Sequence, residues 1–162
     1  GKTLFLRAVA DMDPHGGRVF LDERSSTDLT GPEWRRRVGY LPSESAWWFE
    51  SVGEHLNGVT PEWLRDLGFR EDVLGWQVSR LSSGERQRLA LIRLLANKPL
   101  ALLLDEPTAN LDADNIDKAE SFLTAYRERR HPPVIWVSHD ADQLARVAHR
   151  RFRLLSDGLA PL

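Results

Sequence analysis

The feature that most constrains the fold is a run of five apolar residues, Leu100 to Leu104, the longest such run in the chain. Successive side chains of a strand point to opposite faces, so an uninterrupted apolar run has to be covered on both sides. Pro99 separates the run from the helical pattern that precedes it. A short strand that is apolar on both faces is typical of a parallel sheet with helices on each side.

Strand-like and helix-like segments alternate along much of the chain. Pro133–Val137 resembles a second buried strand, and Val38–Leu41 is a short β-rich run stopped by Pro42. Strands alternating with helices predict an α/β domain with a largely parallel sheet. The pattern predicts helices at about 2–10, 84–97, 113–130 and 140–148, strands at 18–22 and 151–155, and a turn at Gly31-Pro32 followed by a charged helical stretch to Arg37.

The middle of the chain has a different composition from the two ends. From Ser43 to Leu81, short amphipathic pieces are separated by Gly and Pro, and four of the six tryptophans occur there. This pattern indicates a small helical insert. We therefore expect one domain whose core comprises residues 1–43 and 82–162, interrupted by an insert at about 44–81.

Composition excludes several kinds of site. Among the 162 residues there is no cysteine, which rules out disulfides, thiolate metal sites and cysteine nucleophiles. The net charge of −2 gives no reason to expect nucleic-acid binding, which normally needs a basic excess. No apolar run approaches the roughly 18 residues that a membrane-spanning helix requires. If the protein works at a membrane, another chain would supply the spanning part.

Polar residues follow three of the predicted strands. Asp105-Glu106 follows the Leu100–Leu104 run, Ser138-His139 follows the strand that ends at Val137, and Ser43 comes just after the Val38–Leu41 run. Ligands of open α/β sheets bind beyond the carboxyl ends of the strands, so these side chains could meet at one edge. Taken singly, each has a plainer explanation: an acidic pair is usually a solvated turn, and a lone histidine is usually structural.

Two further segments have the composition of phosphate-binding sites. Gly1-Lys2-Thr3 matches the end of the pattern G-x-x-x-x-G-K-[ST], in which backbone N–H groups and the lysine hold phosphates and the hydroxyl binds Mg²⁺. Ser82, Ser83, Gly84 and Glu85 precede or begin the helix at about 84–97, where free N–H groups can bind an anion. Ordinary N-capping by Ser82 or Ser83 explains the second segment equally well.

Together, and in this order, these segments resemble the ATP-binding cassette (ABC) family of P-loop ATPases. LSSGERQRLALIRLL, at 81–95, resembles the family's signature segment. ALLLDEPTANLD, at 101–112, resembles its Walker B strand and D-loop, WVSHD resembles its switch-histidine segment, and GKT resembles the tail of its Walker A loop. The resemblance covers nearly the whole chain and implies a P-loop NTPase-like fold.

The resemblance also implies a role for each matching residue. Gly1, Lys2 and Thr3 would bind the phosphates of ATP, and Thr3 and Asp105 would hold Mg²⁺. Glu106 would polarise the attacking water, and His139 would sense the γ-phosphate. Ser82, Ser83, Gly84 and Glu85 would contact ATP held by the opposite subunit of a homodimer or paired cassette, and Asp112 would communicate across that dimer.

Three positions depart from the family's pattern. Ser83 replaces a glycine, and so adds a side chain where the backbone would approach a phosphate. Glu85 replaces a glutamine, which is a common variation. Ser43 occupies the place of a glutamine that usually touches Mg²⁺ and the attacking water, and serine reaches less far. We expect weaker or rearranged coupling between the insert and the nucleotide for this reason.

The resemblance further implies a subunit of a transporter on the cytoplasmic face of the membrane. In the family, the insert and its neighbourhood receive a helix of the membrane permease. We expect Trp47, Trp48 and Phe49 to line part of that groove, since aromatic residues are common anchors; packing inside the insert is the alternative. A non-transport ABC ATPase acting on DNA or ribosomes, or a pseudo-ATPase that only dimerises, are the other functions considered.

The chain begins within the phosphate-binding loop that the resemblance defines. Residues expected upstream would include the first strands and the aromatic residue that stacks on adenine. Lys2 would then have no strand before it. We expect the isolated chain to bind ATP poorly and to hydrolyse little of it, and the longer parent protein to do both.

Overall fold

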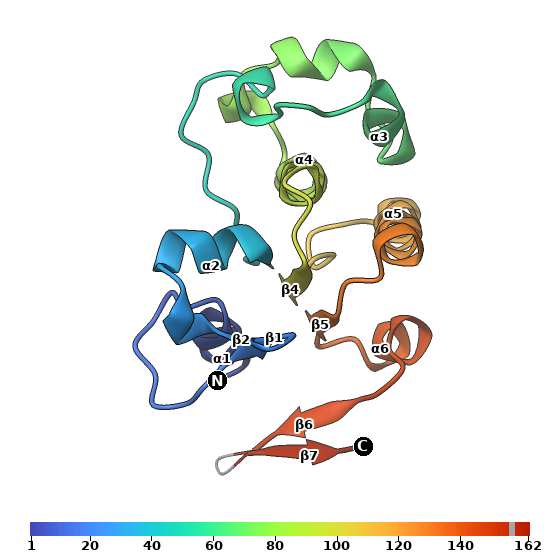
Figure 1. Ribbon diagram of the computed structural model, residues 1–162. Helices are drawn as coiled ribbons and strands as arrows, with labels where there is room; N and C mark the ends of the chain where they lie inside the picture. The colour runs from blue at the N-terminus through green and yellow to red at the C-terminus, as the bar shows by residue number, and fades with distance from the viewer. Residues whose placement is uncertain (156–157) are drawn as a thin grey trace.

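The computed structural model describes residues 1–155 and 158–162 and centres on a three-stranded parallel sheet (Figure 1). Leu41 pairs with Leu104, and Asp105 pairs with Val137, so the three strands end at the same edge of the sheet. This arrangement confirms the predicted α/β class. In spatial order the strands are β3 (Val38–Leu41), β4 (Ala101–Asp105) and β5 (Val134–Val137).

The central strand β4 is buried along its whole length, as the apolar run predicts. Leu102 and Leu104 belong to one hydrophobic cluster, and Ala101 and Leu103 belong to another on the opposite face. Leu100 lies outside the strand and is 44% exposed, so the strand begins one residue later than the run. Burial of both faces fixes the register, because a one-residue slip would exchange the two sets of side chains.

Helices cover both faces of the sheet. In Figure 1, α1 and α2 lie on one side, and α4 and α5 lie on the other. Gly39 in β3 allows α4 to approach closely, because a Cβ there would lie 2.7 Å from a methyl carbon of Leu94. The helices are α1 (Lys2–Val9), α2 (Gly31–Arg37), α4 (Ser83–Ala96), α5 (Ala113–Arg130) and α6 (Ala141–Val147).

The segment between β3 and α4 forms short helical pieces at the top of Figure 1. Its buried side chains, among them Val52, Leu64 and Val73, pack into the same cluster as α4 and α5. Trp63 meets the ring of Phe122 in α5 edge-on, with the ring centroids 5.4 Å apart. The segment therefore shares its core with the body of the molecule. Its elements are η2 (Gly53–His55), α3 (Pro61–Asp66), η3 (Glu71–Gly75) and η4 (Val78–Arg80).

Two predicted strands are present but lie outside the parallel sheet. The one expected at 18–22 shortens to β1 (Phe20–Leu21), which pairs with β2 (Arg24–Ser25) through a tight turn with Asp22 at φ +54°. The one expected at 151–155 is β6 (Phe152–Leu154), paired with β7 (Leu159–Pro161). Local hairpin pairing satisfies their backbone groups, so neither strand needs the main sheet.

One predicted turn is in fact the beginning of a helix. Gly31 and Pro32 form the first turn of α2, where proline is tolerated because its missing N–H would have no partner there. The Glu33 carboxylate accepts a hydrogen bond from the backbone N–H of Thr30, at 2.9 Å. Among the helices that the structure describes, none is long and apolar enough to cross a membrane.

Candidate functional site

The amino end of α1 presents free backbone donors at the edge where the strands end. Gly1 is the N-cap residue and makes no side-chain capping bond, so the first N–H groups of the helix have no capping side chain. The four N-terminal N–H groups of a helix lack partners within it and carry a partial positive charge. Lys2 and Thr3 open this helix, with Lys2 half-buried and Thr3 exposed. The position suits a phosphate group.

Glu106 immediately follows β4 and has an unusual backbone conformation. Its φ is +50°, in the left-handed region that a non-glycine residue seldom adopts. Its N–H donates to the carbonyl oxygen of Val137 at 3.0 Å, which ties it to the end of β5. Its Oε1 is buried and has no hydrogen-bond partner among the described residues. A buried carboxylate oxygen without a partner is costly, so a ligand or water would be well placed here.

His139 links Glu106 to the amino end of α1. Its Nε2 lies 3.5 Å from Glu106 Oε1, and its Nδ1 lies 3.3 Å from Lys2 Nζ. Lys2 Nζ also lies 3.4 Å from His139 Nε2, so the ammonium is close to both ring nitrogens. The side chain is 82% exposed, so a ligand can reach it. Lys2, Glu106 and His139, distant in the sequence, therefore meet at one edge of the sheet.

Asp105 lies one residue before Glu106 and is almost fully buried, at 2% exposure. The hydroxyl of Tyr40 in β3 donates to its Oδ2 at 3.3 Å. Burial, reinforced by the charge of Asp105, raises the pKa of Tyr40 to about 12. Tyr40 therefore stays a neutral donor at physiological pH. Sequence reasoning missed Tyr40, although its polar tip near the end of a short apolar strand was a usable signal.

Ser43 follows β3 by two residues and lies at the same edge by the register of β3 with β4. Its side chain is exposed. The structure therefore places Ser43 near this edge of the sheet.

The predicted signature segment forms the start of α4. Ser82 is the N-cap residue, and its hydroxyl accepts from the N–H of Glu85 at 3.2 Å. The Glu85 carboxylate accepts in turn from the N–H and from the hydroxyl of Ser82, both at 2.8 Å, and these two bonds lower the pKa of Glu85. Ser83 is the exposed first residue of the helix. Within this chain, Ser82 and Glu85 therefore cap α4, whereas the side chain of Ser83 is exposed.

Gly84 packs against the turn that follows β4. A Cβ at this position would lie 2.9 Å from the carbonyl oxygen of Asn110, so glycine is needed for this approach. Asp112 ends the turn and caps α5, accepting from the N–H of Asn115 at 2.9 Å. This bond, with a second one from the Asn115 side chain, lowers the pKa of Asp112. The predicted signature and D-loop residues thus form a second group, built on the contact between α4 and this turn.

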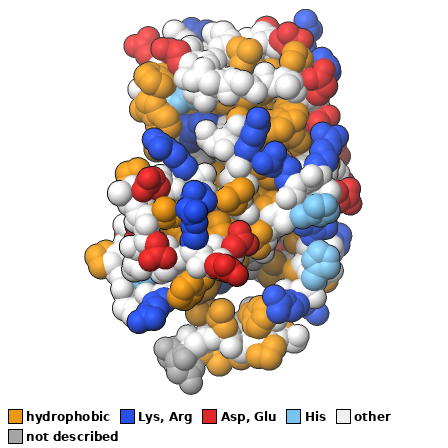
Figure 2. Space-filling view, viewed as in Figure 1, with side chains coloured by type: hydrophobic (Ala, Val, Ile, Leu, Met, Phe, Trp, Pro, Cys, Tyr) orange, Lys and Arg blue, Asp and Glu red, His pale blue; other side chains and the backbone are white. Residues whose placement is uncertain are grey.

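The three aromatic residues of the insert surround one histidine. His55 is buried, and the rings of Trp47, Trp48 and Phe49 have centroids 4.7 to 5.0 Å from its ring. Trp47 packs against the main hydrophobic cluster, whereas Trp48 and Phe49 are 65% and 47% exposed. Figure 2 shows hydrophobic side chains gathered beside the loop that enters the insert. Trp47 is therefore packed inward, as the alternative expected, whereas Trp48 and Phe49 contact His55 and remain partly exposed.

The residues at the edge of the sheet fit magnesium bound together with phosphate. Among the described residues, no group of three His, Cys, Asp or Glu side chains forms a metal cage. Mg²⁺ is commonly held by one or two protein oxygens, waters and the phosphates of a substrate. Asp105 and the exposed hydroxyl of Thr3 supply oxygens of that kind.

This geometry combines an uncapped helix end and a lysine with a carboxylate and an imidazole beside them. A family model described as ABC transporter matches residues 1–109, more than half of the chain. The chain belongs to this family.

Individual relatives in that family are named ATP-binding proteins. The molybdenum import ATP-binding protein ModC of Rhizobium etli is 34% identical over 98% of the chain and 49% of its own length. The ModC protein of Albidiferax ferrireducens is 36% identical, over 91% of the chain and 45% of its own length. The chain thus spans about half the length of the curated relatives it matches.

Solved structures agree on the fold. A dimeric ATP-binding cassette in a post-hydrolysis state bound to ADP and Pi superposes with a TM-score of 0.77 at 25% identity, over 93% of this chain and 74% of its own. A cobalt transport ATP-binding protein, described as putative, has the same TM-score at 24% identity, over 100% of this chain and 64% of its own, and supports the fold alone.

Proposed function

We propose that the full-length protein binds and hydrolyses ATP at the edge formed by α1, β4 and β5. The observation that carries this proposal is the closeness of three side chains: His139 lies 3.3 Å from Lys2 Nζ and 3.5 Å from Glu106 Oε1. Lys2 also opens α1, whose first N–H groups have no capping side chain. Phosphoryl transfer depends mainly on positioning and charge neutralisation, which these groups can supply.

Each residue has a distinct part in the proposed reaction. The N–H groups of Gly1, Lys2 and Thr3 and the Lys2 ammonium bind the phosphates. Glu106 orients the attacking water and accepts its proton, since the buried Oε1 makes no hydrogen bond with the described residues. His139, which is exposed and next to Lys2, donates to the γ-phosphate. Mg²⁺, when held by Thr3 and Asp105, would neutralise charge on the phosphates.

Steady-state ATP hydrolysis by the full-length protein and its Glu106→Gln variant tests the proposal. The variant keeps the size of the side chain and loses the carboxylate charge. We expect ATP still to bind and kcat to fall by about a hundredfold or more, as expected for loss of a general base. A variant that hydrolyses ATP at the wild-type rate would remove Glu106 from the reaction.

We further propose that hydrolysis drives transport through a separate membrane permease, with the protein on the cytoplasmic face of the membrane. Trp48 and Phe49 are exposed at the insert and are suitable anchors for a partner helix. The names of several relatives at 33–36% identity favour molybdenum import as the first transport reaction to assay.

Two tryptophan variants test the proposed permease contact. Trp48→Ala should uncouple transport while basal ATPase activity remains, and it should cost little stability because the side chain is 65% exposed, although its ring contacts His55. Trp47→Ala is the contrasting variant, and it should lower the free energy of unfolding because Trp47 packs against the core. Full transport by Trp48→Ala would contradict the proposed contact.

A further inference from the structure

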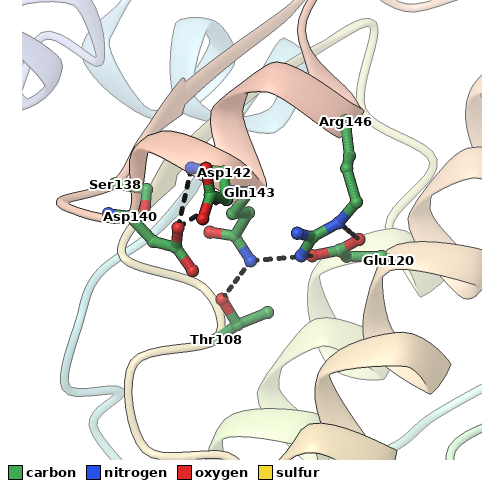
Figure 3. Close-up of polar contacts among 7 residues, drawn as sticks. All are labelled: Thr108, Glu120, Ser138, Asp140, Asp142, Gln143 and Arg146. Atoms are coloured by element: carbon green, nitrogen blue, oxygen red, sulfur yellow. Dashed lines mark hydrogen bonds and ion pairs between the residues drawn. The ribbon is translucent and has the colours of Figure 1, made fainter.

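Gln143 is a buried amide that joins three elements. It lies in the first turn of α6 and is 2% exposed. Its Nε2 donates to Thr108 Oγ1 at 2.8 Å and to Glu120 Oε1 at 2.9 Å, so both amide hydrogens are used (Figure 3). Buried polar groups with all their donors satisfied hold their surroundings in one arrangement. Thr108 belongs to the turn after β4, and Glu120 belongs to α5.

On one side of this amide is the turn that carries Glu106. Thr108 follows Glu106 by two residues and is 6% exposed. The turn is closed by a bond from the N–H of Ala109 to the carbonyl oxygen of Glu106, at 3.2 Å. Because Glu106 has a strained positive φ, its conformation depends on the residues that hold this turn.

On the other side is the segment that carries His139. Asp140 caps α6 by accepting from the N–H of Gln143 at 3.0 Å, and the N–H of Asp140 donates to Ser138 Oγ at 3.0 Å (Figure 3). His139 lies between Ser138 and Asp140, and its exposed side chain has little packing of its own. Its position is therefore set by the backbone of this segment and by the start of α6.

We propose that Gln143 is a positioning residue that sets the placement of Glu106 relative to His139, by fastening the start of α6 to Thr108. The inference rests on the proposed hydrolysis of ATP at this site. Small displacements of catalytic groups are costly to the rate, and about 1 Å can cost a hundredfold. Gln143 itself touches neither group, so it acts through Thr108 and the α6 cap.

The neighbouring ion pair gives a matched control. Arg146 also binds Glu120, at 3.1 Å, but its side chain is 52% exposed, and its hydrogen bonds among the described residues go to Glu120. The pair is exposed on the Arg146 side alone, because the Glu120 side chain is 14% exposed. Arg146→Ala removes a partner of the same Glu120 and leaves the bond from Gln143 to Thr108 in place.

A double-mutant cycle on ATP hydrolysis tests the inference in the full-length protein. Gln143→Met keeps the length of the side chain without its donors, and Thr108→Val keeps the shape without the hydroxyl. We expect each to lower kcat about tenfold with little change in KM. The double variant should be no slower than either single variant, since both remove the same bond. Arg146→Ala should keep the wild-type kcat.

Several outcomes would overturn the inference. Equal loss of kcat in Arg146→Ala or additive losses in the double variant would indicate general destabilisation, and a KM that rises as kcat falls would indicate disturbed nucleotide binding. An active wild-type protein with an unaffected Gln143→Met variant would overturn this inference alone. A wild-type protein that does not hydrolyse ATP, or whose activity survives Glu106→Gln, would overturn the proposed function first.

Discussion

At the scale of the residue, Glu106 owes its placement to constraints on both sides. Its N–H is bound to β5 and its carbonyl oxygen to Ala109, which holds φ at +50° against the usual steric preference. Its Oε1 is buried beside His139 and makes no hydrogen bond with the described residues. Strained residues of this kind are often found at functional sites. Sequence reasoning identified Glu106 as a candidate, but it could not predict this backbone conformation.

Tyr40 offers a prediction that depends on pH. Its pKa in the folded protein is raised to about 12, and the pKa of Tyr126 is also raised by burial. In the unfolded chain a tyrosine titrates near about 10. The unfolded state therefore loses protons first, and the free energy of unfolding should fall as pH rises from about 10 toward 12.

The ultraviolet absorbance of tyrosinate measures this directly. In the folded protein Tyr40 should ionise at about pH 12, and in urea it should ionise near about pH 10. Tyr40→Phe should remove the ionisation step at about pH 12 and make the free energy of unfolding fall less steeply as pH rises. A folded protein in which Tyr40 ionises near its ordinary pKa would contradict the bond to Asp105.

At the scale of the element, the sequence was sufficient wherever burial or a cap decided the structure. The apolar run at 100–104 predicted β4, and α5 has the predicted bounds of 113–130. It was insufficient where pairing is local, because a short strand such as β6 has the same pattern whether it joins a sheet or a hairpin. It also missed Thr108 and Gln143, since their bond joins residues 35 positions apart and leaves no local pattern.

The contact of α4 with the turn after β4 leads to a prediction on stability. Gly84→Ala places a methyl group 2.9 Å from the carbonyl oxygen of Asn110, so one of them must shift. We expect the free energy of unfolding to fall by about 1–3 kcal/mol, as for other overpacked sites. Urea denaturation measures it, with Gly75→Ala as a control, because nothing lies within 4 Å of a Cβ there. Equal stabilities of the two variants would contradict the close approach.

At the scale of the whole molecule, the two groups of predicted site residues lie on different parts of the chain. Lys2, Glu106 and His139 are in contact, whereas Ser82–Glu85 cap α4 and pack against the turn at Asn110. One of the structural relatives is a dimer. We infer that ATP bound at the first group of one copy meets the exposed Ser83 of a second copy.

Sedimentation of the full-length Glu106→Gln protein tests this assembly. ATP should convert it to a dimer, and ADP should not, because only ATP supplies the γ-phosphate. Ser83→Glu should abolish the dimer through repulsion of the phosphate, without loss of folding, because Ser83 is exposed. Ser79→Glu, also exposed but outside this segment, should leave the dimer intact. Dimer formation by Ser83→Glu would contradict the assembly.

The most direct measurement is a crystal structure of the full-length Glu106→Gln protein with MgATP. We expect the γ-phosphate within hydrogen-bond distance, about 3 Å, of Lys2 Nζ and His139, with the magnesium ion beside Thr3 and Asp105. Phosphates bound away from the amino end of α1, or a γ-phosphate out of reach of His139, would contradict the nucleotide site proposed at the ends of β4 and β5.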